Sequence, residues 1–182
     1  IKDFGALGPR FLNVTEKSHK QSNKYEEIGK INSISGSAMC FDTITFDKVG
    51  GFDENIFLYF EETDYCIRAN KKGYKMYQIN KATVEHPRGA SEGVVKTKNF
   101  REISNLEKLY SWHFVWSKYY VYKKHYGKWI AILYFIPSLI RIIYRINLYK
   151  YKKNIDKKEK YQVRLDGLIS SIKGTKSIKR LL

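Results

Sequence analysis

The sequence predicts an α/β domain over residues 1–100 followed by a basic helical tail over residues 101–182. The first part alternates short apolar runs with glycines and charged turns, a pattern typical of short strands and helices. The tail contains long, aromatic-rich segments with the periodicity of helices. With 43% hydrophobic and 15% aromatic residues, the chain has enough apolar surface to offset the entropy lost on folding.

The first half of the domain is expected to contain few regular elements. The sequence of residues 1–32 predicts a loop with one strand near 11–14. The small residues within 34–41 predict a turn that leads into a short β-type run. Residues 43–49 predict one short helix. It should end at the following Gly-Gly pair, because glycine readily adopts the left-handed conformation that terminates helices.

A second helix is expected at residues 61–72. Acidic residues occupy its first turn, basic residues occupy its last turn, and Gly73 follows as a stop signal. Two short strands are expected after it, near 75–79 and 82–85.

The periodicity of apolar residues in the tail predicts three helices. Residues 105–125 and 129–149 form two long patterns separated at Gly127, and residues 159–172 form a shorter one.

Basic charge is concentrated in the tail. Residues 1–117 hold 17 basic and 15 acidic side chains, whereas residues 118–182 hold 17 basic and 3 acidic ones. Such a tail can face nucleic acid, an anionic membrane or water. No zinc-finger or RNA-recognition signature is present, so we expect no nucleic-acid partner.

An apolar segment at residues 129–140 favours the membrane alternative. The run is shorter than the roughly 20 residues that cross a bilayer, contains Pro137 and ends at Arg141. Aromatic residues lie at both margins, as at a membrane interface. We expect a helix in the headgroup region of an anionic membrane surface; a helix buried against the rest of the protein is the alternative.

The two cysteines, Cys40 and Cys66, lack the spacing of a metal-binding pair and predict small core residues of a reduced protein. The first residues do not lead into an apolar signal segment. We therefore expect a cytoplasmic protein that is peripheral on the inner face of the cell membrane.

Three carboxylates open the helix predicted at 61–72. Glu61, Glu62 and Asp64 lie within four residues, and like charges at 4 Å repel by about 1 kcal/mol even in water. The helix N-terminus offsets part of this repulsion. On a helix Glu61 lies over Asp64 and Arg68, whereas Glu62 points elsewhere, so the two glutamates can have different roles. Simple stabilisation of the first helical turn is the alternative.

Several motifs follow one another in a fixed order. They are Gly36-Ser37-Ala38-Met39, Val49-Gly50-Gly51-Phe52-Asp53-Glu54, Glu61-Glu62-Thr63-Asp64 and Val84-Glu85-His86. Together they resemble the C-terminal, acceptor-side half of family 2 glycosyltransferases of the GT-A fold, and rhamnosyltransferase-like members in particular. The resemblance covers roughly residues 34–90 and implies a partial GT-A domain followed by a membrane-associating tail.

The resemblance implies a catalytic role for the acid cluster. The family motif normally reads Glu-Asp-x-Asp, and its second residue deprotonates the acceptor hydroxyl. That position is Glu62 here, one methylene longer than aspartate, with Glu61 and Asp64 beside it. The implied reaction is inverting transfer of a sugar from a nucleotide sugar, which requires the base within hydrogen-bond distance of the acceptor.

The resemblance also implies substrate-binding and metal-binding residues. Gly36 and Ser37 would form a loop that substrate approaches, and Asp53 with Glu54 would bind sugar hydroxyls. For Gly50 and Gly51, which precede Asp53, the alternative is a purely structural role as a tight turn and helix stop. His86 would bind a divalent metal, magnesium or manganese, together with an Asp-x-Asp pair.

The expected partners are a nucleotide-sugar donor and a glycan or lipid-linked acceptor in surface polysaccharide synthesis. The half of the family that carries the nucleotide site and the Asp-x-Asp motif has no counterpart in this sequence, so we expect activity to need it. The alternative is a noncatalytic basic protein that binds membrane or nucleic acid, or an inactive truncated relic.

Overall fold

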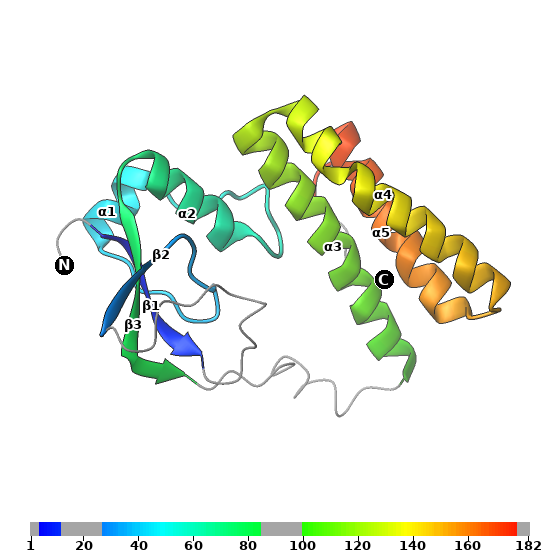
Figure 1. Cartoon of the computed structure of the whole chain (residues 1–182), viewed down its shortest axis with the longest axis horizontal. Coiled ribbons are helices and arrows are strands. Elements are labelled where there is room, and N and C mark those ends of the chain that lie inside the picture. Colours follow the sequence, from blue (N-terminus) through cyan, green and yellow to red (C-terminus); the bar gives the residue numbers. More distant parts are fainter. Residues whose placement is uncertain (1–3, 12–26, 85–99, 178–182) are drawn as a thin grey trace. The chain divides into compact units, whose positions relative to one another are not determined.

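The computed structural model describes residues 4–11, 27–84 and 100–177 and divides the chain into two compact units (Figure 1). The sheet unit comprises residues 1–53 and 61–96. The helical unit comprises residues 54–60 and 97–182. A short segment that the sequence groups with the first domain thus packs with the helical unit. The fold is α/β as predicted, with three strands and five helices among the described residues.

The sheet unit is built on three strands. They are β1 (Phe4–Phe11), β2 (Ile28–Ile31) and β3 (Lys75–Val84), in the order β1-β3-β2. The pairing of β1 with β3 is parallel, and the pairing of β2 with β3 is antiparallel. The central strand β3 therefore links two segments that are distant in sequence.

Two glycines explain why β1 is not evident from the sequence. A methyl group on Gly5 would lie 2.8 Å from Met76 Sδ, and one on Gly8 would lie 2.5 Å from Ile34 Cγ2. Both glycines thus permit close packing inside a strand, although they resemble turn residues in the sequence. The strand expected near 11–14 falls largely outside the described residues.

The two short strands expected at 75–79 and 82–85 are wrong in one respect, because β3 is continuous. Its partners on β1 jump from Pro9 opposite Ile79 to Arg10 opposite Thr83, so the register shifts by the three residues of β3 that lie between. The β-type run expected at 34–41 is also shorter in the structure, where Cys40 forms a single bridge with Leu7.

Two helices of the sheet unit match their predictions closely. Helix α1 (Thr43–Val49) begins where Asp42 accepts a hydrogen bond from the Thr45 amide at 2.9 Å, and it ends at Gly50, whose φ is 85°. Helix α2 (Glu61–Lys71) is followed by Gly73 with φ of 90°. The predicted glycine stops are confirmed.

One face of α2 packs on the core of the sheet unit. The core consists of Ala6, Ile34, Val49, Tyr65, Cys66, Ala69 and Met76. The Tyr65 hydroxyl donates to the Gly5 carbonyl at 3.0 Å, which ties α2 to β1. Cys66 is a core residue as predicted, whereas Cys40 is exposed and its predicted core position is wrong. This packing fixes the orientation of the acidic first turn of α2 on the sheet.

The helical unit contains α3 (Phe100–Tyr126), α4 (Lys128–Tyr151) and α5 (Ile155–Lys173). All three predicted helices are confirmed with wider bounds, and the break at Gly127 has φ of 90°. Helix α5 begins earlier than predicted because Asn154 caps it, accepting from the Lys157 amide at 3.0 Å.

Helices α3 and α5 approach each other closely. A methyl group on Gly167 would lie 2.6 Å from the Trp112 carbonyl oxygen. The Trp112 indole donates to Asp166 at 2.8 Å, and Ser171 donates to the Trp116 carbonyl at 2.9 Å. These bonds and the buried Leu168 fix the pairing of α3 with α5.

Helix α4 runs through Pro137 without interruption and spans 24 residues. By length and composition it is long and apolar enough to cross a membrane, a test that a core helix of a soluble protein also passes. The prediction of an apolar run too short to cross a bilayer counted only residues 129–140 and is wrong about length, because the apolar composition continues past Arg141 in the same helix.

Candidate functional site

The acid cluster forms the first turn of α2 in the sheet unit. Glu61 and Glu62 are partly exposed, whereas Asp64 is fully buried. One carboxylate oxygen of Glu61, Oε2, is buried and has no hydrogen-bond partner among the described residues. A buried acceptor without a partner is unfavourable, so Glu61 has unused capacity to accept a hydrogen bond.

Glu62 has an altered acidity. Burial raises the pKa of the Glu62 carboxyl, and the negative charge of Glu61 raises it further. The backbone N–H groups of Glu62 and Thr63 oppose this rise in pKa. A carboxylate with a raised pKa is a stronger base, which is the property that proton abstraction from a hydroxyl requires.

The loop that contains Gly36 lies against Glu62. A methyl group on Gly36 would lie 3.6 Å from Glu62 Cβ and 3.7 Å from its Cγ and Cδ, which is ordinary contact distance. Gly36 and Ser37 are both exposed, and the Ser37 amide bonds to Ser35 Oγ at 3.4 Å. The structure thus brings together the loop and the predicted base, which are 26 positions apart in the sequence.

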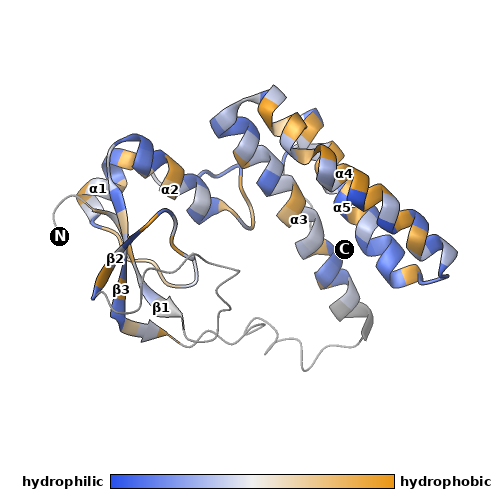
Figure 2. Ribbon diagram, viewed as in Figure 1, coloured by the Kyte–Doolittle hydropathy of each residue, from blue (hydrophilic) through white to orange (hydrophobic). Residues whose placement is uncertain are grey.

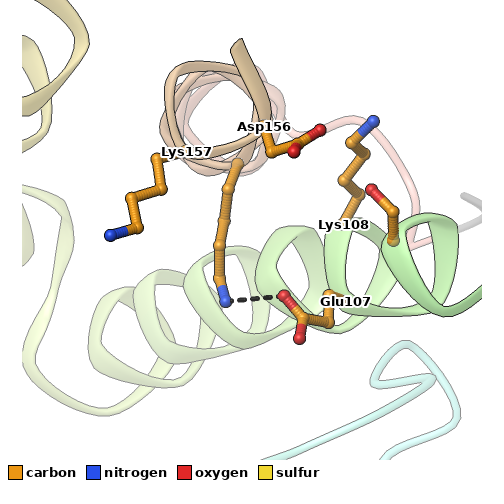
Figure 3. A pocket seen from close by; sticks show the side chains of 6 residues that line it. Glu107, Lys108, Asp156 and Lys157 are labelled. Carbon is orange, nitrogen blue, oxygen red and sulfur yellow. Dashed lines mark hydrogen bonds and ion pairs between the residues drawn. The ribbon is translucent and has the colours of Figure 1, made fainter. Parts of the chain in front are cut away.

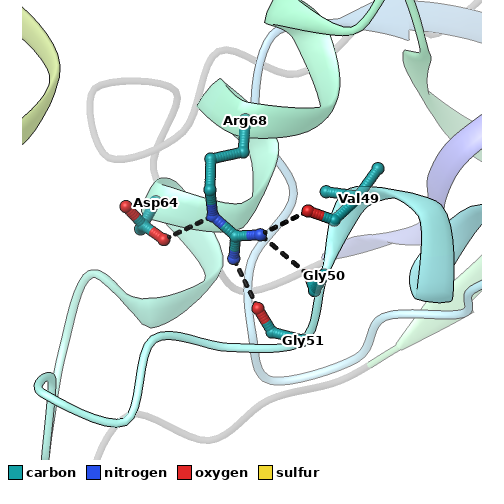
Figure 4. Close-up of polar contacts among 5 residues, drawn as sticks. All are labelled: Val49, Gly50, Gly51, Asp64 and Arg68. Atoms are coloured by element: carbon teal, nitrogen blue, oxygen red, sulfur yellow. Dashed lines mark hydrogen bonds and ion pairs between the residues drawn. The ribbon is translucent and has the colours of Figure 1, made fainter.

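Asp64 is engaged in a polar network centred on Arg68 (Figure 4). The Arg68 Nε donates to Asp64 Oδ2 at 2.8 Å. Its two terminal nitrogens donate to the carbonyls of Val49, Gly50 and Gly51 at 2.6–3.0 Å. We call these five residues the Arg68 clamp. It connects Asp64 and α2 to the Gly-Gly turn, a connection that the sequence did not reveal.

The predicted sugar-binding pair is divided between the two units. Asp53 follows the clamped turn and belongs to the sheet unit, where it is half-buried. Glu54 is exposed and belongs to the helical unit. The structure therefore groups Gly36, Ser37, Asp53, Glu61, Glu62 and Asp64 in one unit, without Glu54.

Sequence reasoning missed the conformation of the segment 54–60. Tyr59 and Phe60, which immediately precede the acid cluster, have φ of 66° and 70°. Bulky residues rarely adopt this left-handed conformation, and it persists where surrounding contacts enforce it. No feature of the local sequence indicates it.

Helix α3 supplies the contacts that hold this segment in the helical unit. The Ser117 hydroxyl donates to the Leu58 carbonyl at 2.8 Å. The rings of Tyr59 and Phe60 lie 5.7 Å and 5.2 Å from the ring of Phe114. Such aromatic pairs add roughly 0.5–1.5 kcal/mol each beyond burial, enough to balance backbone strain of the same order.

The predicted metal ligand His86 lies outside the described residues. Within residues 4–11, 27–84 and 100–177, no group of three or more histidine, cysteine, aspartate or glutamate residues could hold a metal ion. The acid cluster therefore does not form a complete metal site with its described neighbours.

A separate pocket of about 240 Å³ lies between α3 and α5 in the helical unit (Figure 3). Its lining consists of Ser104, Glu107, Lys108, Asp156, Lys157 and Lys160. Lys160 pairs with Glu107 at 3.0 Å, and Lys108 pairs with Glu159 at 2.6 Å. These charges are satisfied by pairing between the helices, so the pocket is explained by helix packing.

Comparisons with known proteins find distant matches to glycosyltransferases. A segment of 90 residues, 50% of this chain, is 30% identical to an N-acetylglucosaminyl-diphospho-decaprenol L-rhamnosyltransferase of Mycobacterium tuberculosis and covers 29% of that protein. A second match, 22% identical over 102 residues, is to the low-salt glycan biosynthesis hexosyltransferase Agl10 of Haloferax volcanii; it covers 46% of this chain and 33% of that protein.

These matches indicate a distant glycosyltransferase-like relationship over about half of the chain. The chain spans about a third of the length of the curated relatives that it matches. No protein-family model matches the chain, and no solved structure matches it significantly. The GT-A fold and the correspondence to a C-terminal half stay predictions.

Proposed function

We propose that this chain is the acceptor-side part of an inverting glycosyltransferase that acts at the cytoplasmic face of the cell membrane in surface polysaccharide synthesis. Its donor is a nucleotide sugar carrying a hexosyl or rhamnosyl group, and its acceptor is a glycan or a lipid-linked glycan. The observation that carries the proposal is the acid cluster, in which a glutamate of raised pKa lies beside an exposed glycine loop. The two named relatives support the reaction class.

Glu62 is the proposed base. Its carboxylate accepts the proton of the acceptor hydroxyl while the hydroxyl oxygen forms a bond to the anomeric carbon. The bond from that carbon to the diphosphate breaks on the opposite face, and the nucleoside diphosphate leaves with the electron pair. Partial burial keeps water away from the carboxylate and favours its uptake of the proton.

The other two carboxylates have different proposed roles. Glu61 accepts a hydrogen bond from a substrate hydroxyl through Oε2, because this buried oxygen has no partner among the described residues. Asp64 acts through Arg68 to position the turn that leads to Asp53. Asp53, Glu54, Gly36 and Ser37 stay proposed substrate contacts.

The proposal includes a magnesium or manganese ion, but residues outside this site would have to bind it. The described residues do not provide three ligands together, and the sequence contains no Asp-x-Asp pair. His86 would contribute one ligand, and an Asp-x-Asp pair from elsewhere would contribute the others. Such an ion would neutralise the leaving diphosphate.

The test is Glu62→Gln in a full-length protein that contains this segment, assayed with a panel of nucleotide sugars that includes a rhamnose donor. Loss of general-base catalysis should lower kcat by roughly 10²- to 10⁴-fold with little change in donor KM. Glu27→Gln is the matched control, because Glu27 is an exposed glutamate of the same unit whose side chain pairs with exposed Lys81. Unchanged kcat in Glu62→Gln would reject Glu62 as the base.

A further inference from the structure

Helix α4 is apolar over much of its length (Figure 2), and many of its large apolar side chains are exposed. The exposed side chains are Trp129, Leu133, Ile136, Ile140, Ile143 and Tyr144. Their spacing of three and four residues places them along one side of the helix. Trp129 is 74% exposed and Ile140 is 63% exposed, so this is a contiguous apolar stripe of the kind that marks an interaction surface.

The opposite face of α4 already has its partners. Ala131, Phe135 and Ile142 are buried, and the Phe135 ring lies 5.3 Å from the ring of Tyr119 on α3. Ala131, Phe135 and Tyr119 form one core cluster with Leu168 of α5. Helix α4 is therefore apolar on a packed face and apolar again on an exposed face, whereas a surface helix normally has a polar outer face.

The charges around the exposed stripe are all positive on this helix. Lys128, Arg141 and Lys150 are exposed, and α4 contains no aspartate or glutamate. Lys128 Nζ lies 5.6 Å from the centre of the Trp129 ring, at the start of the stripe. Lys152 and Lys153 follow the helix and are also exposed.

We propose that this face of α4 binds the surface of an anionic lipid bilayer, with the helix axis in the membrane plane. The apolar stripe enters the boundary between headgroups and acyl chains, and the lysines and Arg141 contact anionic headgroups. A second copy of the chain is a poor occupant, because two such faces would bring cations together without acidic residues of α4 to neutralise them.

The structure favours an in-plane helix over a spanning one. Arg141 is exposed near the middle of α4, where a spanning helix would place it at the bilayer centre at a cost of about 2.5–3.5 kcal/mol on insertion scales. In the plane of the interface the same side chain reaches the headgroups. Spanning would also require α4 to separate from the charged helices α3 and α5.

Vesicle binding of the 182-residue chain tests the surface. The chain should bind vesicles of phosphatidylcholine with phosphatidylglycerol and bind vesicles of phosphatidylcholine alone much more weakly. The double variant Leu133→Glu/Ile140→Glu should weaken binding by roughly a hundredfold, because it removes apolar contact and adds negative charge. Ile44→Glu on α1 is the matched control, since Ile44 is also 63% exposed, and it should bind as the wild type.

Tryptophan fluorescence tests the orientation. Trp112 and Trp116 are each 3% exposed, so Trp129 should dominate any blue shift on membrane binding. The variant Trp129→Phe/Ile140→Trp moves this probe to the middle of α4. In-plane binding predicts stronger quenching by lipids brominated near the headgroup, whereas a spanning helix predicts stronger quenching by lipids brominated near the chain ends.

Several results would overturn the proposal: no binding to either vesicle, equal binding to both, equal loss in Ile44→Glu, or quenching from the chain ends. Self-association that Leu133→Glu/Ile140→Glu abolishes, without vesicle binding, would assign the face to a second copy. The inference does not rest on the proposed glycosyltransferase activity, because it is argued from residues of α4 alone and its measurement is vesicle binding. Circular dichroism of each variant checks that it is folded.

Discussion

The two units depart from the usual inside–outside arrangement in opposite ways. The sheet unit buries a carboxylate, Asp64, and places an arginine beside it. The helical unit keeps ion pairs such as Lys108–Glu159 at its surface and exposes the apolar stripe of α4. Polar groups inside and apolar groups outside are the informative exceptions in a folded protein. Each exception coincides with a proposed role, positioning of the acid cluster in one unit and membrane binding in the other.

The buried charge of the sheet unit gives the largest expected stability effect. Arg68→Ala leaves Asp64 buried without its cation and should lower the free energy of unfolding by about 3–5 kcal/mol, measured by urea denaturation. Arg68→Lys is the informative control, because it keeps the charge but lacks the planar guanidinium that reaches three carbonyls. Its free energy of unfolding should lie between those of the wild type and Arg68→Ala. Wild-type stability in Arg68→Ala would remove the contrast between the units.

Close helix packing in the helical unit gives the second-largest expected effect on stability. Gly167→Ala would place a methyl group 2.6 Å from the Trp112 carbonyl oxygen and should lower the free energy of unfolding by about 1–3 kcal/mol. Gln162→Ala is the control, because Gln162 is exposed on the same helix and its replacement should change stability by no more than about 0.5 kcal/mol. A stabilised Gly167→Ala would mean that α3 and α5 can separate slightly without loss.

The smallest expected effects are changes of folding stability with pH, and these changes have opposite signs in the two units. Burial raises the pKa of Glu62, so its ionisation opposes folding, and stability should fall as pH rises from the unfolded pKa through the folded one. The hydrogen bond and charge of Lys108 lower the pKa of Glu159, so ionised Glu159 stabilises the folded state slightly. This small stabilisation should disappear as pH falls through the folded pKa.

Unfolding measured against pH in Glu62→Gln and Glu159→Gln tests this difference. Relative to the wild type, Glu62→Gln should gain stability toward neutral pH, and Glu159→Gln should lose a little there. Neither difference should persist in strong acid, where both carboxyls are protonated. Parallel profiles for the two variants would contradict the assignment of a buried and an exposed carboxyl.

Local signals in the sequence predicted the helices well. The acidic first turn and basic last turn of α2 and the glycines at 50, 73 and 127 are local signals, and the helix ends beside them lie where expected. The strands depend on distant partners. Gly5 and Gly8 resemble turn residues until Met76 and Ile34 are placed against them.

The same distinction applies to the candidate site. The spacing of Asp64 and Arg68 on one side of α2 could be anticipated, but the three carbonyls that Arg68 binds come from a turn 17–19 residues earlier. The left-handed Tyr59 and Phe60 depend on contacts with α3 and have no local signal. His86 lies outside the described residues, so its role as a metal ligand stays a prediction.

The Arg68 clamp has a consequence for molecular recognition. Because one guanidinium fixes three successive carbonyls, the chain leading to Asp53 is ordered during folding and not at the moment a ligand arrives. A sugar bound at the proposed contact Asp53 would meet a preorganised surface, and less of its binding energy would be spent on immobilising the protein. Selectivity at this position should depend on shape more than on adaptation.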